Sequence, residues 1–290
     1  MIAMPPPPPE PIRFEVLLSQ SWALFRRNWI VALPPVIAFG IILLVLAAFA
    51  AVAVIVVLAH GGFEHPRFED GGSAYAGAFV LAYLAFMVGV VILSLWVNAA
   101  VYGMADAVWE RGTATFGDGF AAFRTRSGAL FVAGLGFIGL AFAALILALP
   151  TLGLAFIAFP LFTMYVLPAV VGGRRDGFEA IGESFRLVRD FFGASAIAWL
   201  VLAGIHYGIS MLASFALLPL QFAMIPLMAA NGRFVLPAIG LVAGSGIAFL
   251  VAIAATLAYG GYYAIAVVGL YRSLRAQPAG GVSPGRSLAV

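Results

Sequence analysis

The chain has 290 residues, of which 64% are hydrophobic and 9% charged, with a net charge of +3 at pH 7. Soluble domains carry about 25% charged residues, so this composition excludes a soluble globular fold and indicates a polytopic membrane protein. The basic residues are fifteen arginines with no lysine. This small positive excess argues against a nucleic-acid partner. The absence of cysteine excludes disulfides and thiolate catalysis.

The chain begins with a proline-rich segment, residues 1–12, which has five consecutive prolines and no basic n-region. The first apolar stretch that follows is about 30 residues long, far longer than the h-region of a signal peptide. We therefore predict a disordered leader followed by an uncleaved first membrane span. A disordered tail is predicted for residues 276–290.

Uncharged stretches mark the predicted spans, because an ionised side chain at the bilayer centre is costly and one crossing needs about 20 residues. Residues 127–173 are long enough for two crossings, and Leu-Pro-Thr-Leu-Gly at 149–153 predicts a turn between them. No element is predicted for residues 219–233. A single all-α membrane domain of six spans is expected over residues 13–275. The predicted spans are residues 30–59, 75–105, 128–149, 152–172, 193–217 and 236–271.

The arginines are divided unequally between the two sides of this arrangement. Thirteen lie before the first span, in the loops after the second and fourth spans, or in the tail; Arg67 and Arg233 lie in the other connections. Since basic residues are enriched on the cytoplasmic side of membranes, this distribution predicts cytoplasmic termini for a protein of the inner (cytoplasmic) membrane.

A seven-residue pattern recurs before the first, third and fifth spans, at residues 20–26, 118–124 and 183–189. Each copy has a polar, a small, an aromatic, two variable, an apolar and an arginine residue. The aromatic residue and the apolar residue three positions later predict a shared apolar face, typical of a helix in the headgroup layer. We expect three amphipathic elbow helices, each preceding a helical hairpin, in a pseudo-threefold arrangement. The alternative is that short segments entering a span from the cytoplasm are commonly basic and aromatic.

Three segments carry a resemblance to a known family. They are Ser-x-Ser-Trp-x-Leu-Phe-Arg-Arg-Asn-Trp at 19–29, Thr-Phe-Gly-Asp-Gly-Phe at 115–120 and Glu-Ser-Phe-Arg-Leu-Val-Arg-Asp-Phe-Phe at 183–192. Over residues 13–275 the chain resembles bacterial six-span membrane proteins related to the membrane domain of some glycerophosphoryl diester phosphodiesterases. The resemblance implies a membrane module concerned with lipid headgroups. It supplies no catalytic residues, because the chain has no soluble catalytic domain.

An arginine ends each copy of the repeat: Arg26, Arg124 and Arg189. A guanidinium can bind a phosphate through two hydrogen bonds, whereas an ammonium acts as a point charge. These arginines are the candidate contacts for anionic headgroups, and membrane lipids are the expected partners. A GC-rich genome would explain the absence of lysine, but it does not explain an arginine at the same position of every copy.

Polar residues follow one another at intervals of four in the second span: Ser94, Asn98, Tyr102, Asp106 and Glu110. This spacing places them along one helical stripe. One hypothesis is a hydrated vestibule in which Asp106 or Glu110 pairs with an elbow arginine. The other is an ordinary helix end in which Asn98 hydrogen-bonds a neighbouring helix.

His206 lies deep in the fifth span, and Ser210 shares its helical face. A neutral histidine hydrogen-bonded to another helix and a proton-linked or ligand-binding role both fit this position. Two further patterns are interpreted structurally: Gly-x-Gly-x-x-Gly at 134–139 as close helix packing, and the His- and Glu-containing residues 60–70 as a solvated loop. The sequence predicts no metal site and no cofactor.

Without a convergent catalytic constellation, we expect a non-enzymatic inner-membrane protein that binds, organises or helps move envelope lipids or their headgroups. A transporter or channel for a small neutral or apolar solute is the first alternative. Asn98, Tyr102, Asp106, His206 and Ser210 would line its polar pathway. The second alternative is a membrane scaffold for a partner protein. The sequence assigns no oligomeric state.

Overall fold

The computed structural model describes residues 13–59, 72–229 and 235–277, and its regular elements there are helices without any strand. The predicted leader, most of the predicted tail and the loop at 60–70 lie outside the described residues. The elements are α1 (Phe14–Arg27), the 3-10 helix η1 (Trp29–Ala32), α2 (Leu33–Ala59), α3 (Gly72–Arg111), α4 (Phe116–Ala148), α5 (Leu154–Thr163), α6 (Val166–Val171), α7 (Gly177–Asp190), α8 (Phe192–Ala229) and α9 (Val235–Arg275).

Six helical stretches of the described chain are long and apolar enough to cross a bilayer, so the protein is an all-α polytopic membrane protein. They are Trp29–Val52, Val80–Arg111, Phe116–Ala148, Leu154–Val171, Phe192–Phe215 and Gly244–Arg275. The turn predicted at 149–153 is confirmed, since α4 ends at Ala148 and α5 begins at Leu154. Gly153 adopts a left-handed conformation there, with φ +84°.

The fourth span differs from its prediction, because a break at Met164 and Tyr165 divides it into α5 and α6. Pro168 lies four residues after Met164, has no N–H to donate to the Met164 carbonyl, and so disfavours a continuous helix. The Ser184 hydroxyl of α7 occupies the break: it accepts from the Tyr165 N–H at 3.2 Å and donates to the Phe162 carbonyl at 2.6 Å.

The fifth helix is longer than its predicted span. Residues 219–229, for which no element is predicted, continue α8 to Ala229 without a break. Pro219 and Pro226 lie within this helix. Membrane helices tolerate such interruptions of their hydrogen bonding, because neighbouring groups can satisfy the freed carbonyls.

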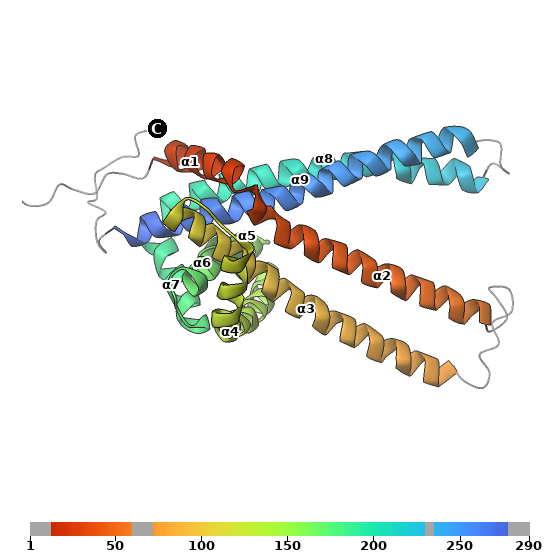
Figure 1. Cartoon of the computed structure of the whole chain (residues 1–290), viewed down its shortest axis with the longest axis horizontal. Coiled ribbons are helices and arrows are strands. Elements are labelled where there is room, and N and C mark those ends of the chain that lie inside the picture. Colours follow the sequence, from red (N-terminus) through yellow and green to blue (C-terminus); the bar gives the residue numbers. More distant parts are fainter. Residues whose placement is uncertain (1–12, 60–71, 230–234, 278–290) are drawn as a thin grey trace, which may run out of the picture.

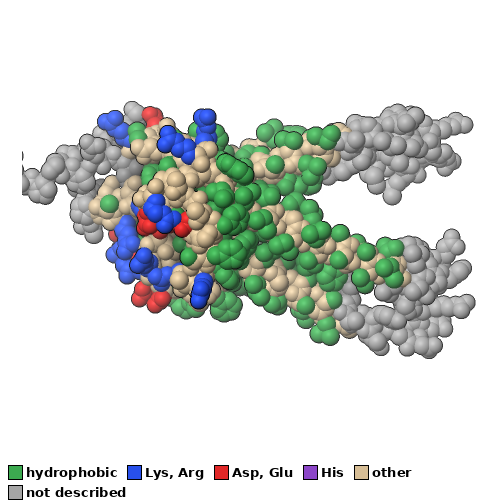
Figure 2. Space-filling view, in the orientation of Figure 1, with side chains coloured by type: hydrophobic (Ala, Val, Ile, Leu, Met, Phe, Trp, Pro, Cys, Tyr) green, Lys and Arg blue, Asp and Glu red, His purple; other side chains and the backbone are tan. Residues whose placement is uncertain are grey.

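The helices meet at one end of the molecule. Figure 1 shows α2 with α3, and α8 with α9, extending in the same direction from this end, whereas α4 is foreshortened in the same view. Both ends of the described chain also lie there. Figure 2 shows the charged side chains gathered at this end and the apolar side chains beyond it. We call it the polar end and define it by residues 13–28, 106–126, 172–190 and 271–277.

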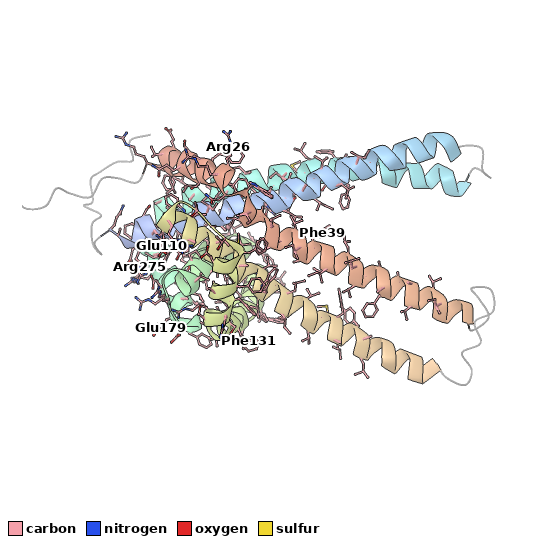
Figure 3. All side chains as sticks on the ribbon, viewed as in Figure 1. Arg26, Phe39, Glu110, Phe131, Glu179 and Arg275 are labelled. Carbon is pink, nitrogen blue, oxygen red and sulfur yellow. The ribbon has the colours of Figure 1, made fainter. Side chains whose placement is uncertain are left out.

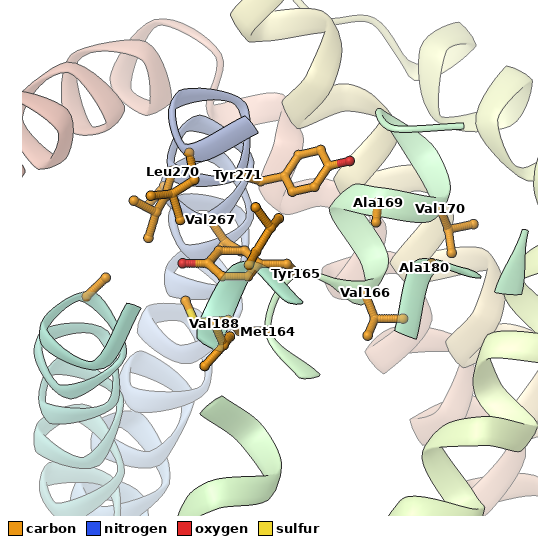
Figure 4. Close-up of a cluster of buried hydrophobic side chains, with 14 of the residues drawn as sticks. Met164, Tyr165, Val166, Ala169, Val170, Ala180, Val188, Val267, Leu270 and Tyr271 are labelled. Atoms are coloured by element: carbon orange, nitrogen blue, oxygen red, sulfur yellow. The ribbon is translucent and has the colours of Figure 1, made fainter. Parts of the chain in front are cut away.

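The buried core lies next to the polar end. Its best-buried part joins α6, α7 and α9 around Tyr165, Val166, Val267 and Tyr271 (Figure 4). In α2, by contrast, no described side chain after Ala38 is buried. The described far part of α2 is therefore exposed, as expected for a surface that contacts lipid tails.

Glycines permit close approach between helices in this core. A Cβ at Gly269 of α9 would overlap the Trp109 indole of α3, whose Nε1 donates to the Ile265 carbonyl at 2.7 Å. A Cβ at Gly136 of α4 would overlap the Ile181 side chain of α7. The glycines at 134–139 all lie within α4, but of the three only Gly136 makes such a close contact, since a Cβ at Gly139 would meet nothing within 4 Å.

The three copies of the repeat take two different forms. The first lies in α1 and the third in α7, both separate from the helix that follows. The second is the N-terminal part of the continuous helix α4, so a separate second elbow helix is not found. A capping box of Thr115 and Asp118 starts α4, and no proline separates Arg124 from the apolar part.

Candidate functional site

The copies share one pattern of burial. The small residue and the apolar residue four positions later face the protein, as in Ser21 and Phe25; the aromatic residue and the arginine four positions later are exposed, as in Trp22 and Arg26. This differs from the expected shared face of the aromatic and apolar residues. The exposed pairs are Trp22 with Arg26, Phe120 with Arg124, and Phe185 with Arg189.

The small residues explain why this face turns inward. A Cβ at Gly119 would lie 2.9 Å from the Cα of Ala100, so only glycine permits this contact between α4 and α3. Ser21 is fully buried and satisfies its hydroxyl by donating to the Leu17 carbonyl at 2.7 Å. Ser184 bonds to the break between α5 and α6. Each copy thus packs closely through its small residue, which leaves the aromatic residue and the arginine outside.

The elbow helices α1 and α7 each end in a corner of the chain with the same backbone conformation. Asn28, two residues after Arg26, has φ −125° and ψ 44°; Phe191, two residues after Arg189, has φ −126° and ψ 44°. The Asn28 N–H donates to the Leu24 carbonyl, and the Phe191 N–H donates to the Leu187 carbonyl four residues back. The first and third copies are therefore alike in backbone geometry as well as in sequence.

Asn28 also links the corner at the end of α1 to the loop between α3 and α4. Its side chain is 5% exposed, donates from Nδ2 to the Gly112 carbonyl at 3.0 Å and accepts at Oδ1 from the Ala114 N–H at 3.1 Å. A further bond runs from Nδ2 to the Leu24 carbonyl at 3.0 Å. At the corresponding position of the third copy, Phe191 has no polar side-chain atom to form such bonds.

Asp106 pairs with an arginine other than the expected ones. Arg272, near the end of α9, donates from Nε at 2.9 Å and from a terminal nitrogen at 2.6 Å to Asp106 Oδ1. The same guanidinium lies 3.0 Å from Glu110 Oε1. The expectation that an elbow arginine pairs with Asp106 or Glu110 is therefore wrong. Because α9 also packs against α3, its last turn supplies the cation.

A second charged network, absent from the sequence predictions, centres on Glu183 of α7. Arg175 Nε donates to Glu183 Oε2 at 2.7 Å, and the Tyr271 hydroxyl donates to Oε1 at 2.7 Å. Arg275 approaches the same carboxylate to 3.7 Å. The Glu183 carboxylate raises the pKa of Arg175 above its ordinary value, so this guanidinium stays charged. Figure 3 places Arg275 and Glu179 in this region of the polar end.

Gly172 and Gly173 make room for these networks. A Cβ at Gly172 would lie 2.6 Å from Asp106 Oδ1, and one at Gly173 would overlap the Tyr271 hydroxyl. The pair of glycines directly before two arginines is the feature of the sequence that could have indicated these networks. It indicates a turn held tightly against other helices, although the carboxylates that it meets are far away in the sequence.

The other predicted polar residues do not form one pathway. Tyr102 is buried, and Asn98 donates from Nδ2 to the Ser94 carbonyl of its own helix at 2.8 Å. His206 is exposed on α8, with its ring centroid 5.8 Å from that of Tyr259, and Ser210 accepts from the Ser214 hydroxyl at its carbonyl. The structure therefore brings together Asp106 and Arg272, but does not join His206 or Ser210 to this network.

Comparisons of the chain with protein-family models, with curated proteins and with solved structures give no match. Within the described residues, no group of three histidine or carboxylate side chains could hold a metal ion.

Proposed function

We propose that the protein is a non-enzymatic, integral inner-membrane protein that binds, organises or helps move envelope lipids or their headgroups. The observation that carries the proposal is the outward pairing of an aromatic residue with an arginine in all three repeats. An aromatic ring beside a guanidinium suits the boundary between lipid tails and headgroups. The pairs are Trp22 with Arg26, Phe120 with Arg124, and Phe185 with Arg189.

The charge of the polar end supports anionic lipids as the preferred partners. The described residues include twelve arginines and eight carboxylates, which leaves an excess of four positive charges. Several arginines have no carboxylate within 4.0 Å in the described part of the chain. These are Arg13, Arg26, Arg27, Arg124, Arg126, Arg174 and Arg186. Such guanidiniums retain hydrogen-bond donors for phosphate oxygens.

The alternatives have less support from the same side chains. A transport pathway along α3 would have to pass Tyr102, which is buried, and Asp106, which is paired with Arg272. His206, the other candidate on this pathway, is exposed on α8. A scaffold role for a partner protein has no specific observation in its favour.

Replacing Arg26, Arg124 and Arg189 together by glutamine is expected to reduce the enrichment of anionic lipid around the protein at least tenfold. Each arginine near an anionic surface contributes about 1 kcal/mol of attraction. The measurement is lipid mass spectrometry on the protein extracted with its surrounding membrane in polymer discs, compared with bulk membrane.

The matched control replaces Arg13, Arg174 and Arg186 by glutamine. This variant loses the same charge, but none of these arginines has an aromatic residue four positions before it. A smaller loss is expected from the control. If both variants lose the same amount of anionic-lipid enrichment, the effect depends on total charge and not on the repeats. If anionic lipid is not enriched around the unaltered protein, the lipid proposal is wrong.

The proposed orientation places both termini in the cytoplasm. Reporter fusions at Gly72, the first residue of α3, and at the C-terminus should report opposite sides of the membrane. We expect activity of a cytoplasmic reporter only at the C-terminus and of a periplasmic reporter only at Gly72. The same side for both fusions would contradict the six-span arrangement.

A further inference from the structure

The α1 corner and the α7 corner combine one backbone geometry with different charges. The α1 corner is Arg26-Arg27-Asn28-Trp29, and the α7 corner is Arg189-Asp190-Phe191-Phe192. Asn28 and Phe191 have the same backbone angles within 1°. Because the backbones correspond, Arg27 and Asp190 occupy equivalent positions. The same backbone position therefore carries a positive residue at the α1 corner and a negative residue at the α7 corner.

This difference decides how much positive charge each corner presents. At the α7 corner, Arg189 Nε donates to Asp190 Oδ1 at 3.1 Å, so the pair is neutral overall. At the α1 corner, Arg26 and Arg27 are both exposed, and no carboxylate of the described residues lies within 4.0 Å of either. The α1 corner thus carries two positive charges with free hydrogen-bond donors.

The aromatic residues beside the two corners also differ. Trp22 and Trp29 are 51% and 62% exposed at the α1 corner, whereas phenylalanine occupies both equivalent positions at the α7 corner. An exposed indole combines an apolar ring with an N–H donor, and tryptophan is enriched at the level of lipid headgroups. The α1 corner therefore offers two indoles and two guanidiniums, while the α7 corner offers apolar rings and an internally paired arginine.

The α1 corner is held in place before any ligand binds. The hydrogen bonds of Asn28 to the Gly112 carbonyl and from the Ala114 N–H fix it to the α3–α4 loop. Figure 3 shows Arg26 near the C-terminal end of α1, at the outer edge of the molecule. A site whose backbone is already ordered loses less conformational entropy on binding.

We propose that the α1 corner is a binding site for an anionic phosphodiester headgroup that has no compensating ammonium group, and that the α7 corner does not discriminate between anionic and zwitterionic lipids. This inference rests on the proposed function and assigns its charge selectivity to one of the three repeats. Arg26 and Arg27 bind the phosphate oxygens, and Trp22 and Trp29 lie at the level of the ester groups.

The test exchanges the charges of the two corners in the full chain. The protein is reconstituted in nanodiscs of equimolar phosphatidylglycerol and phosphatidylethanolamine, and the lipids that remain bound are counted by native mass spectrometry. Arg27→Asp should reduce the preference for phosphatidylglycerol about tenfold, since it removes one positive charge and adds a negative one. Asp190→Arg should increase the preference, because it gives the α7 corner two positive charges.

Arg174→Asp is the matched control, because it makes the same charge change at an exposed arginine outside the three repeats. Equal losses for Arg27→Asp and Arg174→Asp would overturn the assignment to the α1 corner and leave the proposed function intact. No preference in the unaltered protein would instead overturn the proposed function. Loss of the preference when inorganic phosphate is added would identify a site for free phosphate rather than for a lipid.

Discussion

Replacing Glu183 by alanine is expected to lower the free energy of unfolding by about 2 to 3 kcal/mol, because two hydrogen bonds to a buried carboxylate are lost together. The Glu183 side chain is 5% exposed and accepts from Arg175 and from the Tyr271 hydroxyl, each at 2.7 Å. It thereby joins the turn before α7 to the last part of α9. Arg175 is 43% exposed, so water compensates part of its loss, which keeps the expected effect below that of a fully buried pair.

The measurement is reversible unfolding of the purified protein in mixed detergent micelles. Glu179→Ala serves as the control, since Glu179 lies on the same helix but is exposed. Its expected effect is within about 0.5 kcal/mol of zero. If both variants unfold at the same detergent composition, the Glu183 network contributes nothing to stability, and the close fit of Gly173 against Tyr271 has another cause.

Replacing Asn28 by alanine is also expected to lower the free energy of unfolding by about 2 to 3 kcal/mol. The variant removes three hydrogen bonds and leaves the Gly112 carbonyl and the Ala114 N–H without their protein partners. Each such bond contributes about 1 kcal/mol net. The same unfolding assay measures the change.

Asn98→Ala is the matched control for this residue type. The Asn98 amide bonds only within its own helix among the described residues, to the Ser94 carbonyl and hydroxyl. Its replacement should change the free energy of unfolding by less than about 0.5 kcal/mol. Equal destabilisation by the two substitutions would mean that Asn28 acts through helix α1 alone and does not tie the corner to the α3–α4 loop.

The repeats illustrate how far a local pattern can predict a site. Their arginines and aromatic residues are visible in the sequence, but the face that each residue joins is not. Positions three and four residues apart both lie near one another on a helix. In each copy, the face that turns inward is the one whose small residue packs closely against the protein. These residues are Ser21, Gly119 and Ser184, and their contacts are a property of the assembled helices.

The break in the fourth span is a second such case. Pro168 is visible in the sequence, yet a proline in a membrane helix can produce a kink, a break or almost no change. Here the Ser184 hydroxyl, from a helix further along the chain, satisfies the Tyr165 N–H and the Phe162 carbonyl. The outcome therefore depended on a tertiary contact.

The sequence by itself determined that this is an all-helical membrane protein with six spans and that a turn follows the third span. These features depend on apolar length, on the exclusion of charge from the bilayer and on local proline and glycine chemistry. Only the tertiary structure decided the pairing of charges. Asp106 meets Arg272, 166 residues away, and Glu183 meets Tyr271, 88 residues away. Guanidiniums are chemically alike, so the partner of each carboxylate is chosen by which helix packs beside it.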